Sequence, residues 1–307
     1  MAGVLSSAVH GNPIARIVSG SNPNRPLFFH RPLAVAVSTT HQSYWSSVNA
    51  DIDAHLNKSI PSKPPLVVFE PMRHLTFSAP QTTAPALCIA ACELVGGHRD
   101  QAIAAASALH LMHASAFTHE NLPLTERPKP TFDHTYGPNI RLLMADGMIA
   151  FGFELLARAD NNSNRVLRAI IEISRAMGTQ GVMAGQYNES QLGESDGTEA
   201  FHVGWLHNVC SKKGGVLHAC AGACGATLGG GSEEEIEKLR RYGLYVGTIQ
   251  GILNRVEKNE WSIKEVKELR VLGLRELKDF NQEKIDQWRY NLISATSEYY
   301  IFNIFKQ

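Results

Sequence analysis

The sequence lacks two features that would each have pointed to a class of protein. It carries no net charge, because 29 lysines and arginines balance 29 aspartates and glutamates over 307 residues. A balanced chain has no long-range field that would attract nucleic acid or an anionic membrane. It also contains no apolar run close to the roughly 18 residues that a membrane-spanning helix requires. Because 44% of its residues are hydrophobic and can bury a core, we expect a soluble globular protein with no membrane span and no nucleic-acid partner.

Acidic residues are absent from the first 50 positions, and the first one is Asp51. Three arginines lie in this segment among serine, threonine, proline and glycine: Arg16, Arg25 and Arg31. An acid-free segment with serine and arginine is typical of an organellar transit peptide, and the apolar core of a secretory signal is missing. We expect residues 1–38 to form a transit peptide that is cleaved near Val35–Thr40. An ordinary disordered N-terminus is the alternative.

Cysteine is scarce, and the odd total of five argues against a disulfide framework. Four of the five form two CxxxC pairs: Cys88 with Cys92, and Cys220 with Cys224. The i, i+4 spacing places each pair on one face of a helix. Three interpretations remain open at this point. The thiols are small buried hydrophobes, they form a helix-face contact with a partner protein, or both pairs converge on zinc, for which CxxxC is a poorer signature than CxxC.

Helical periodicity dominates the chain from Ser43 onward. The first predicted helix has apolar residues at i, i+3, i+7 and i+11, namely Trp45, Val48, Ile52 and Leu56, and it ends at the prolines from Pro61 on. Further helices are predicted at residues 86–94, 100–119, 140–159, 165–177, 198–209, 214–228, 232–253 and from 263 to the C-terminus, with loops at 121–138, 160–164 and 185–197. Ser232 and Glu235 form a predicted capping box. We expect a single all-α domain over residues 43–307, built as a helical bundle.

Several segments occur in an order that resembles one enzyme family. They are Leu87-Cys88-Ile89-Ala90-Ala91-Cys92-Glu93-Leu94-Val95-Gly96-Gly97, Gly178-Thr179-Gln180-Gly181 with Ala184-Gly185-Gln186, and Leu228-Gly229-Gly230-Gly231-Ser232. From about Ser43 to Phe280 the chain is similar to plant geranylgeranyl diphosphate synthases, which are trans-prenyltransferases. The resemblance implies an isoprenoid synthase-type helical bundle. In active members, magnesium ions on two aspartate-rich motifs hold an allylic diphosphate while it couples to isopentenyl diphosphate.

Aspartate is missing at both of those motifs. The resemblance places Glu120, Asn121 and Glu126 at the three aspartates of the first motif, and Gln250, Gly251 and Asn254 at those of the second. Magnesium is a hard cation that prefers carboxylate oxygens, and neutral amides offset little of its desolvation cost. We therefore expect no metal and no cofactor in this chain.

The cations that the family uses for diphosphate are also missing. A lysine and two arginines would stand at Gln81, Thr82 and Ala84, and their loss removes the groups that pair with diphosphate oxygens. Lys213 matches the lysine of a family Lys-Thr pair, but Gly214 replaces the threonine. One remaining cation does not make a diphosphate pocket.

A non-catalytic branch of the family shows a similar pattern: the small subunits of plant heteromeric geranyl diphosphate synthases. The resemblance covers the acid-poor first motif, the Leu-Pro-Leu-Thr that follows it and both CxxxC pairs, which in that branch serve association with a catalytic large subunit. It implies a plastid protein that is not an enzyme by itself. It also implies a heterodimer or heterotetramer with a geranylgeranyl diphosphate synthase large subunit, in which magnesium binds to the partner.

Two other functions stay open from the residues alone. An active short-chain prenyltransferase could use Glu120 and Glu126 in place of aspartates, and the cysteines could form a metal or redox module. His110, His113 and His119 could in principle bind a metal, but we expect histidines that are satisfied by protein groups or lie at an interface. Asp146 matches the aspartate of a family Gly-Asp pair and is expected to support the fold.

Overall fold

The computed structural model describes residues 34–62, 65–122, 135–159, 162–191, 199–255 and 260–289. Every regular element in these ranges is helical, which confirms the all-α prediction. The elements are α1 Ala34–Ser59, α2 Leu66–Ser78, α3 Ala84–Leu94, α4 Arg99–Glu120, α5 Pro138–Ala157, α6 Ser163–Met177, α7 Val182–Gln191, α8 Glu199–Cys210, the π-helical turn η2 Ser211–Gly215, α9 Val216–Gly229, α10 Glu233–Arg255, α11 Glu260–Glu276 and α12 Gln282–Arg289. Within this part of the chain no helix is both long and apolar enough to cross a membrane.

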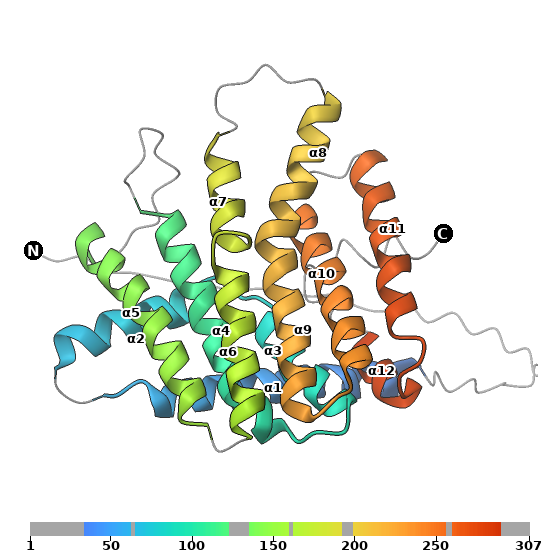
Figure 1. The fold of residues 1–307 in the computed structure, drawn as a ribbon, viewed down its shortest axis with the longest axis horizontal. Helices are drawn as coiled ribbons and strands as arrows, with labels where there is room; N and C mark the ends of the chain where they lie inside the picture. Colours follow the sequence, from blue (N-terminus) through green and yellow to red (C-terminus); the bar gives the residue numbers. More distant parts are fainter. Residues whose placement is uncertain are drawn as a thin grey trace, which may run out of the picture.

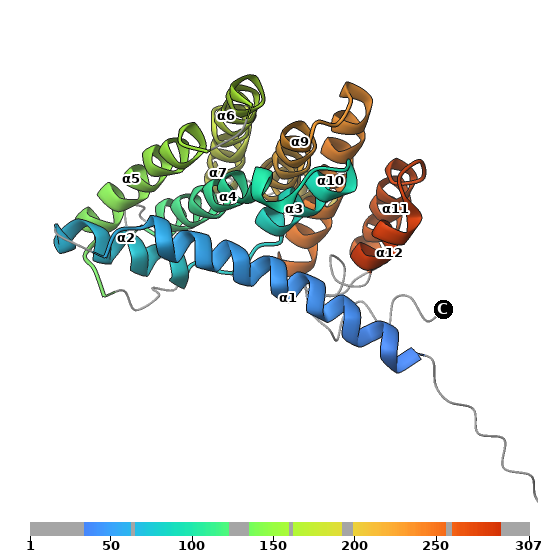
Figure 2. The same cartoon turned by 90° about the horizontal axis from the view of Figure 1, so that it is seen from below.

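The helices form a row with a second layer across it. Helices α5, α4, α9, α10 and α11 stand side by side in Figure 1, and each of the pairs α4–α5, α9–α10 and α10–α11 is in contact. Helix α1 runs across the row, as the view from below shows (Figure 2), and it contacts α3, α4 and α12. Its four predicted core residues, Trp45, Val48, Ile52 and Leu56, are all buried, so its apolar face was predicted correctly.

Helix α9 lies at the centre of the bundle, with α3, α4, α6 and α10 packed around it. All of its residues from Leu217 to Leu228 are buried. Small residues are required on its faces because neighbouring backbones come very close. A β-carbon on Gly225 would lie 2.0 Å from the carbonyl oxygen of Cys88, and one on Gly222 would lie 2.3 Å from that of Leu239. The central packing therefore depends on side chains that are absent or very short.

Three parts of the helix prediction were wrong. Helix α1 begins at Ala34 rather than near Ser43, so the expected cleavage site near Val35–Thr40 lies inside it. Helix α2 was not predicted at all, because Pro71 lies within it and prolines flank it. Residues 185–191 belong to α7 and not to a loop. The polar composition of α7 carries no apolar period, and its helical state comes from its contacts with α6, α8 and η2.

Two further elements differ from the prediction and one agrees. The C-terminal run divides into α11 and α12, separated by residues 277–281. A π-helical turn, which the periodicity did not reveal, connects α8 directly to α9. The capping box of α10 is confirmed, since Glu235 N donates to Ser232 Oγ and Ser232 N donates to Glu235 Oε2 at 2.7 Å.

Substitution of Gly225 tests the close approach of α9 to α3. Gly225→Ala should lower the free energy of unfolding by about 3 kcal/mol or more, because the new methyl group meets backbone that cannot rotate away. Gly204→Ala in α8 is the matched control, since a β-carbon there meets no atom within 4 Å. It should leave stability unchanged or raise it by about 0.5–1 kcal/mol through helix propensity. Urea unfolding followed by circular dichroism measures both, and equal effects would contradict the packing described here.

Candidate functional site

The two motifs that lack aspartate lie at the ends of long helices. Glu120 is the last residue of α4, and Asn121 follows it as the cap, with its own side chain donating to Phe117 O at 2.8 Å. Gln250 and Gly251 are buried in the last turns of α10, and Asn254 is exposed at its end. Glu126 lies outside the described residues.

Lys213 joins the first motif to a carboxylate that the sequence did not single out. Its Nζ lies 2.8 Å from Glu120 Oε2 and 2.5 Å from Glu189 Oε2 of α7. Only 10% of the lysine side chain is exposed, so the ammonium depends on these carboxylates for its stabilisation. Lys213 belongs to the π-helical turn η2, a widened turn of the kind that often directs a side chain at functional sites.

Gln250 of the second motif begins a chain of neutral hydrogen bonds. Its Nε2 donates to Thr83 Oγ1 at 2.6 Å, and Thr83 Oγ1 lies 3.0 Å from His218 Nε2. His218 Nδ1 lies 2.8 Å from the carbonyl oxygen of Gly214. That carbonyl can only accept, so Nδ1 carries the proton and the Thr83 hydroxyl donates to Nε2. Burial lowers the pKa of His218 to about 4, which keeps the ring neutral.

Two glycines at this centre leave no room for the family's side chains. A β-carbon on Gly251 would lie 2.9 Å from Cβ of Cys210, so an aspartate there requires Cys210 to shift. A β-carbon on Gly214 would lie 2.7 Å from the carbonyl oxygen of Gly247, which excludes the family's threonine without movement of α10. At both positions the close packing therefore fits glycine and not the larger side chain of the family.

The described donors of the two motifs do not fit a magnesium site. Glu120 is bound to Lys213, the Gln250 amide donates to Thr83, and Gly251 offers no side chain. Over the described ranges, no group of three or more histidine, cysteine, aspartate or glutamate side chains is placed to hold a metal ion. A hard divalent cation needs several oxygen ligands that converge on it.

The segment that would carry the diphosphate cations forms the start of helix α3. Gln81 is exposed, and Thr82 Oγ1 accepts from the backbone N–H of Ala84 at 3.4 Å. Ala84 is fully buried as the first residue of α3. Residues 81–84 now cap and begin α3, and only Thr83 among them faces the centre, through its bonds to Gln250 and His218.

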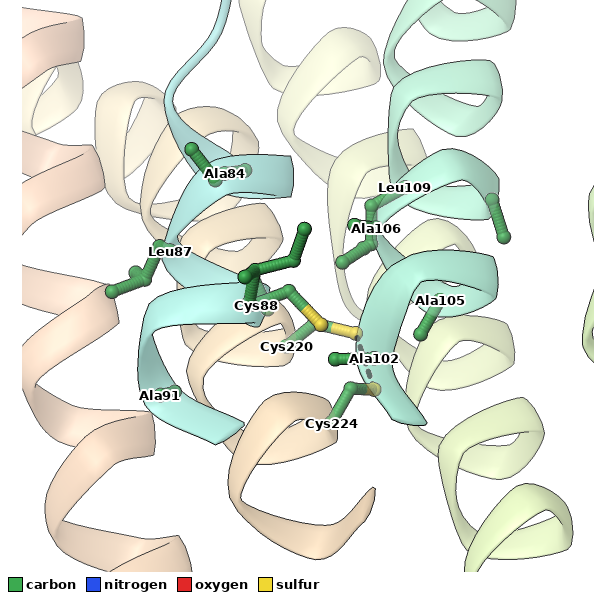
Figure 3. Packing of buried hydrophobic residues seen from close by; sticks show 14 of the residues in the cluster. Ala84, Leu87, Cys88, Ala91, Ala102, Ala105, Ala106, Leu109, Cys220 and Cys224 are labelled. Carbon is green, nitrogen blue, oxygen red and sulfur yellow. Dashed lines mark hydrogen bonds between the residues drawn. The ribbon is translucent and has the colours of Figure 1, made fainter. Parts of the chain in front are cut away.

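Both CxxxC pairs lie inside the chain, where α3 meets α9. Cys88, Cys220 and Cys224 point into the same space beside Ala102 and Ala106 of α4 (Figure 3). The sulfur atoms of Cys220 and Cys224 are 3.8 Å apart. Burial raises the pKa of Cys88 and brings that of Cys92 to about 12. All five cysteines are free and buried, as the interpretation of them as small hydrophobes requires.

The three histidines near the first motif are satisfied by protein groups, as predicted. His110 Nε2 and His113 Nε2 each lie 2.9 Å from a backbone carbonyl oxygen, of Thr76 and of Pro80. His119 Nε2 lies 3.0 Å from Asp146 Oδ1, so Asp146 links α5 to the end of α4.

Comparison with protein families shows which family this chain belongs to. The model of the polyprenyl synthetase family matches residues 66–253, which include the first degenerate motif, Gln250 and Gly251 of the second, both CxxxC pairs and Lys213. This chain belongs to the polyprenyl synthetase family. The resemblance inferred from the sequence segments is therefore confirmed.

Relatives within the polyprenyl synthetase family include several small subunits. The chain is 49% identical over 275 residues to the chloroplastic heterodimeric geranylgeranyl pyrophosphate synthase small subunit 2 of Cannabis sativa, over 85% of this chain and 96% of that protein. The crystal structure of the geranyl diphosphate synthase small subunit from Antirrhinum majus superposes with a TM-score of 0.75, at 51% identity over 81% of this chain and 97% of the other. A chain of a mint heterotetrameric geranyl pyrophosphate synthase, a deletion mutant in complex with ligands, gives a TM-score of 0.72, at 46% identity over 82% of this chain and 99% of the other.

Three residues of this polyprenyl synthetase centre escaped sequence reasoning: Thr83, Glu189 and His218. Thr83 lies between Thr82 and Ala84, at a position where the family has no fixed residue type. Glu189 was assigned to a loop. His218 lies four residues after Gly214, a spacing that could have placed its ring over the turn that carries Lys213.

The neutral His218 predicts a pH dependence of stability. Its pKa is 6.5 when unfolded and about 4 when folded, so the unfolded chain binds a proton that the folded chain excludes. The contribution of His218 is complete above pH 6.5 and declines as the pH falls toward 4. Between pH 7 and pH 5 the loss should be about 2 kcal/mol. His218→Gln should be less stable at pH 7 but should lose about 2 kcal/mol less over this interval in urea unfolding. Equal losses in both proteins would contradict the assignment.

Proposed function

We propose that this chain is the non-catalytic regulatory small subunit of a heteromeric geranyl or geranylgeranyl diphosphate synthase. It binds a catalytic large subunit, as a heterodimer or a heterotetramer, and steers or enhances geranyl diphosphate production for terpenoid biosynthesis. The proposal depends on how the polar side chains are paired at the position where active family members bind diphosphate. Lys213 is paired with Glu120 and Glu189, and Gln250 with Thr83, so the polar groups bind one another. The similarity to small subunits over nearly their whole length supports the same function.

Catalytic silence follows from the chemistry of the reaction. Ionisation of an allylic diphosphate requires metal ions that stabilise the leaving group, and these need carboxylate ligands. The second motif supplies an amide and a glycine at its two buried positions. Magnesium and both substrates then bind to the large subunit. The small subunit acts across the interface, by favouring one conformation of its partner's product pocket.

A surface for the large subunit is available on α6. Leu167 and Ile171 of this helix are exposed by 55% and 40%. They are one turn apart and so share a face. We call Leu167 and Ile171 the apolar stripe. Exposed apolar side chains that share a face in this way are typical of a protein interface.

Co-expression with a plant geranylgeranyl diphosphate synthase tests the proposal. The purified chain alone should give no prenyl product from dimethylallyl and isopentenyl diphosphate with magnesium. The mixture should elute as one complex in size-exclusion chromatography and should make a larger share of the ten-carbon diphosphate than the synthase alone. Leu167→Glu with Ile171→Glu should abolish the complex without unfolding the chain. Val271→Glu in α11, at a side chain 57% exposed and away from the stripe, is the matched control.

Two results would defeat this proposal. Magnesium-dependent turnover by the chain alone would make it an enzyme, and failure to bind any such synthase would exclude the subunit role. The same assay tests whether the CxxxC pairs contribute directly to binding of the large subunit. Because their thiols are enclosed between α3 and α9, we expect Cys88→Ser and Cys220→Ser to weaken the complex only as far as they destabilise the fold. A stable variant that loses the complex would instead give the thiols a direct role in association.

We further propose a plastid location, directed by residues 1–38. The acid-free composition of this segment and the chloroplastic relatives support it. Residues 1–38 fused to a fluorescent protein should direct it into chloroplasts, and the chain without them should stay in the cytosol. A cytosolic fusion would exclude this location. Cleavage within Val35–Thr40 would leave Tyr44 and Trp45 in the mature protein, where Tyr44 donates to Glu93 and Trp45 joins the core.

A further inference from the structure

Four charged side chains form a cluster at the emptied centre, which we call the Lys213 clasp: Lys213, Glu120, Glu189 and Arg255. The geometry points to an internal substitute for the ligand, in which two glutamates take the place of a diphosphate at Lys213 and close the centre without metal or substrate. This inference rests on the proposed non-catalytic function. It adds that ion pairs within the chain stabilise the centre in place of a bound ligand.

The clasp balances its own charge. Lys213 Nζ contacts one oxygen of each glutamate, and Arg255 Nε lies 3.5 Å from the other oxygen of Glu189. Two carboxylates and two cations sum to zero. The two glutamate side chains are only 22% and 23% exposed, so solvent screens the cluster weakly. An approaching diphosphate would meet two carboxylates and no unpaired ammonium group.

The clasp also connects segments that are distant in sequence. Lys213 of η2 and Glu120 of α4 are 93 residues apart, and Glu189 and Arg255 add the ends of α7 and α10. Nearby bonds reinforce the same junction: Gln186 Nε2 donates to Ala116 O at 2.9 Å, and Lys212 Nζ donates to Gln180 O at 2.9 Å. A ligand bound between such elements stabilises a fold by binding only its folded form. The glutamates give the same stabilisation permanently.

Thermal unfolding of the full chain with inorganic pyrophosphate tests the clasp. The wild-type melting temperature should not change with millimolar pyrophosphate, with or without magnesium. Glu120→Gln with Glu189→Gln should melt roughly 5 °C lower, because Lys213 and Arg255 lose their counter-charges. Pyrophosphate should restore part of that loss by pairing with the released cations. Glu233→Gln is the control, since it breaks an exposed pair with Arg168, and it should show neither effect.

Three outcomes would overturn the inference. They are stabilisation of the wild type by pyrophosphate, a double variant as stable as the wild type, and a destabilised double variant that pyrophosphate does not stabilise. If the double variant does not fold, Lys213→Met replaces it. That variant removes the ammonium group between Glu120 and Glu189, so its melting temperature should fall less than that of the wild type from pH 7 to pH 5, and an equal or larger fall would overturn the inference. Pyrophosphate binding without turnover would contradict the clasp alone, whereas turnover by the isolated chain would contradict the proposed function.

Discussion

The close approach of backbones around α9 constrains the rest of this structure. Gly222 meets α10, Gly225 meets α3, and Gly243 of α10 meets the carbonyl oxygen of His218, all at distances that exclude a β-carbon. A helix enclosed on several sides can carry only short side chains where it is crossed. Cysteine and alanine fill the other positions between Ala219 and Ala226 for the same reason. The two CxxxC pairs are thus first of all part of the central packing.

The same constraint determines the shape of the emptied centre. Gly214 and Gly247 bring η2 against α10, and this contact aims Lys213 toward the ends of α4 and α7. In an enzyme, the charged side chains gathered there would need ligands to balance them. In this chain glutamates balance the lysine, and Thr83 accepts from the amide of Gln250 and donates to His218. Lys213 and Gln250 at this centre therefore both have partners within the protein.

Much of the fold was predictable because helical periodicity is a local property. The buried face of α1, the capping box of α10 and the limits of α3 to α6 followed from apolar spacing, proline and glycine. Helix α7 did not, since its polar residues show no apolar period and its neighbours stabilise it. The π-helical turn was missed because it follows from how this segment packs against α10 and α7, and not from a residue pattern.

The sequence by itself determined the fold class and the family, because helical periodicity and residue identity are visible without coordinates. Only the tertiary structure decided which groups bind Lys213 and Gln250. Glu189 is 24 residues from Lys213, and Thr83 is 167 residues from Gln250, so no spacing rule connects them. The tertiary structure also decided that the thiols are buried. An i, i+4 pair shows that two cysteines share a helix face, but it does not show which helices pack against that face. Both outcomes depend on which distant segments meet, and that is set by the packing around α9.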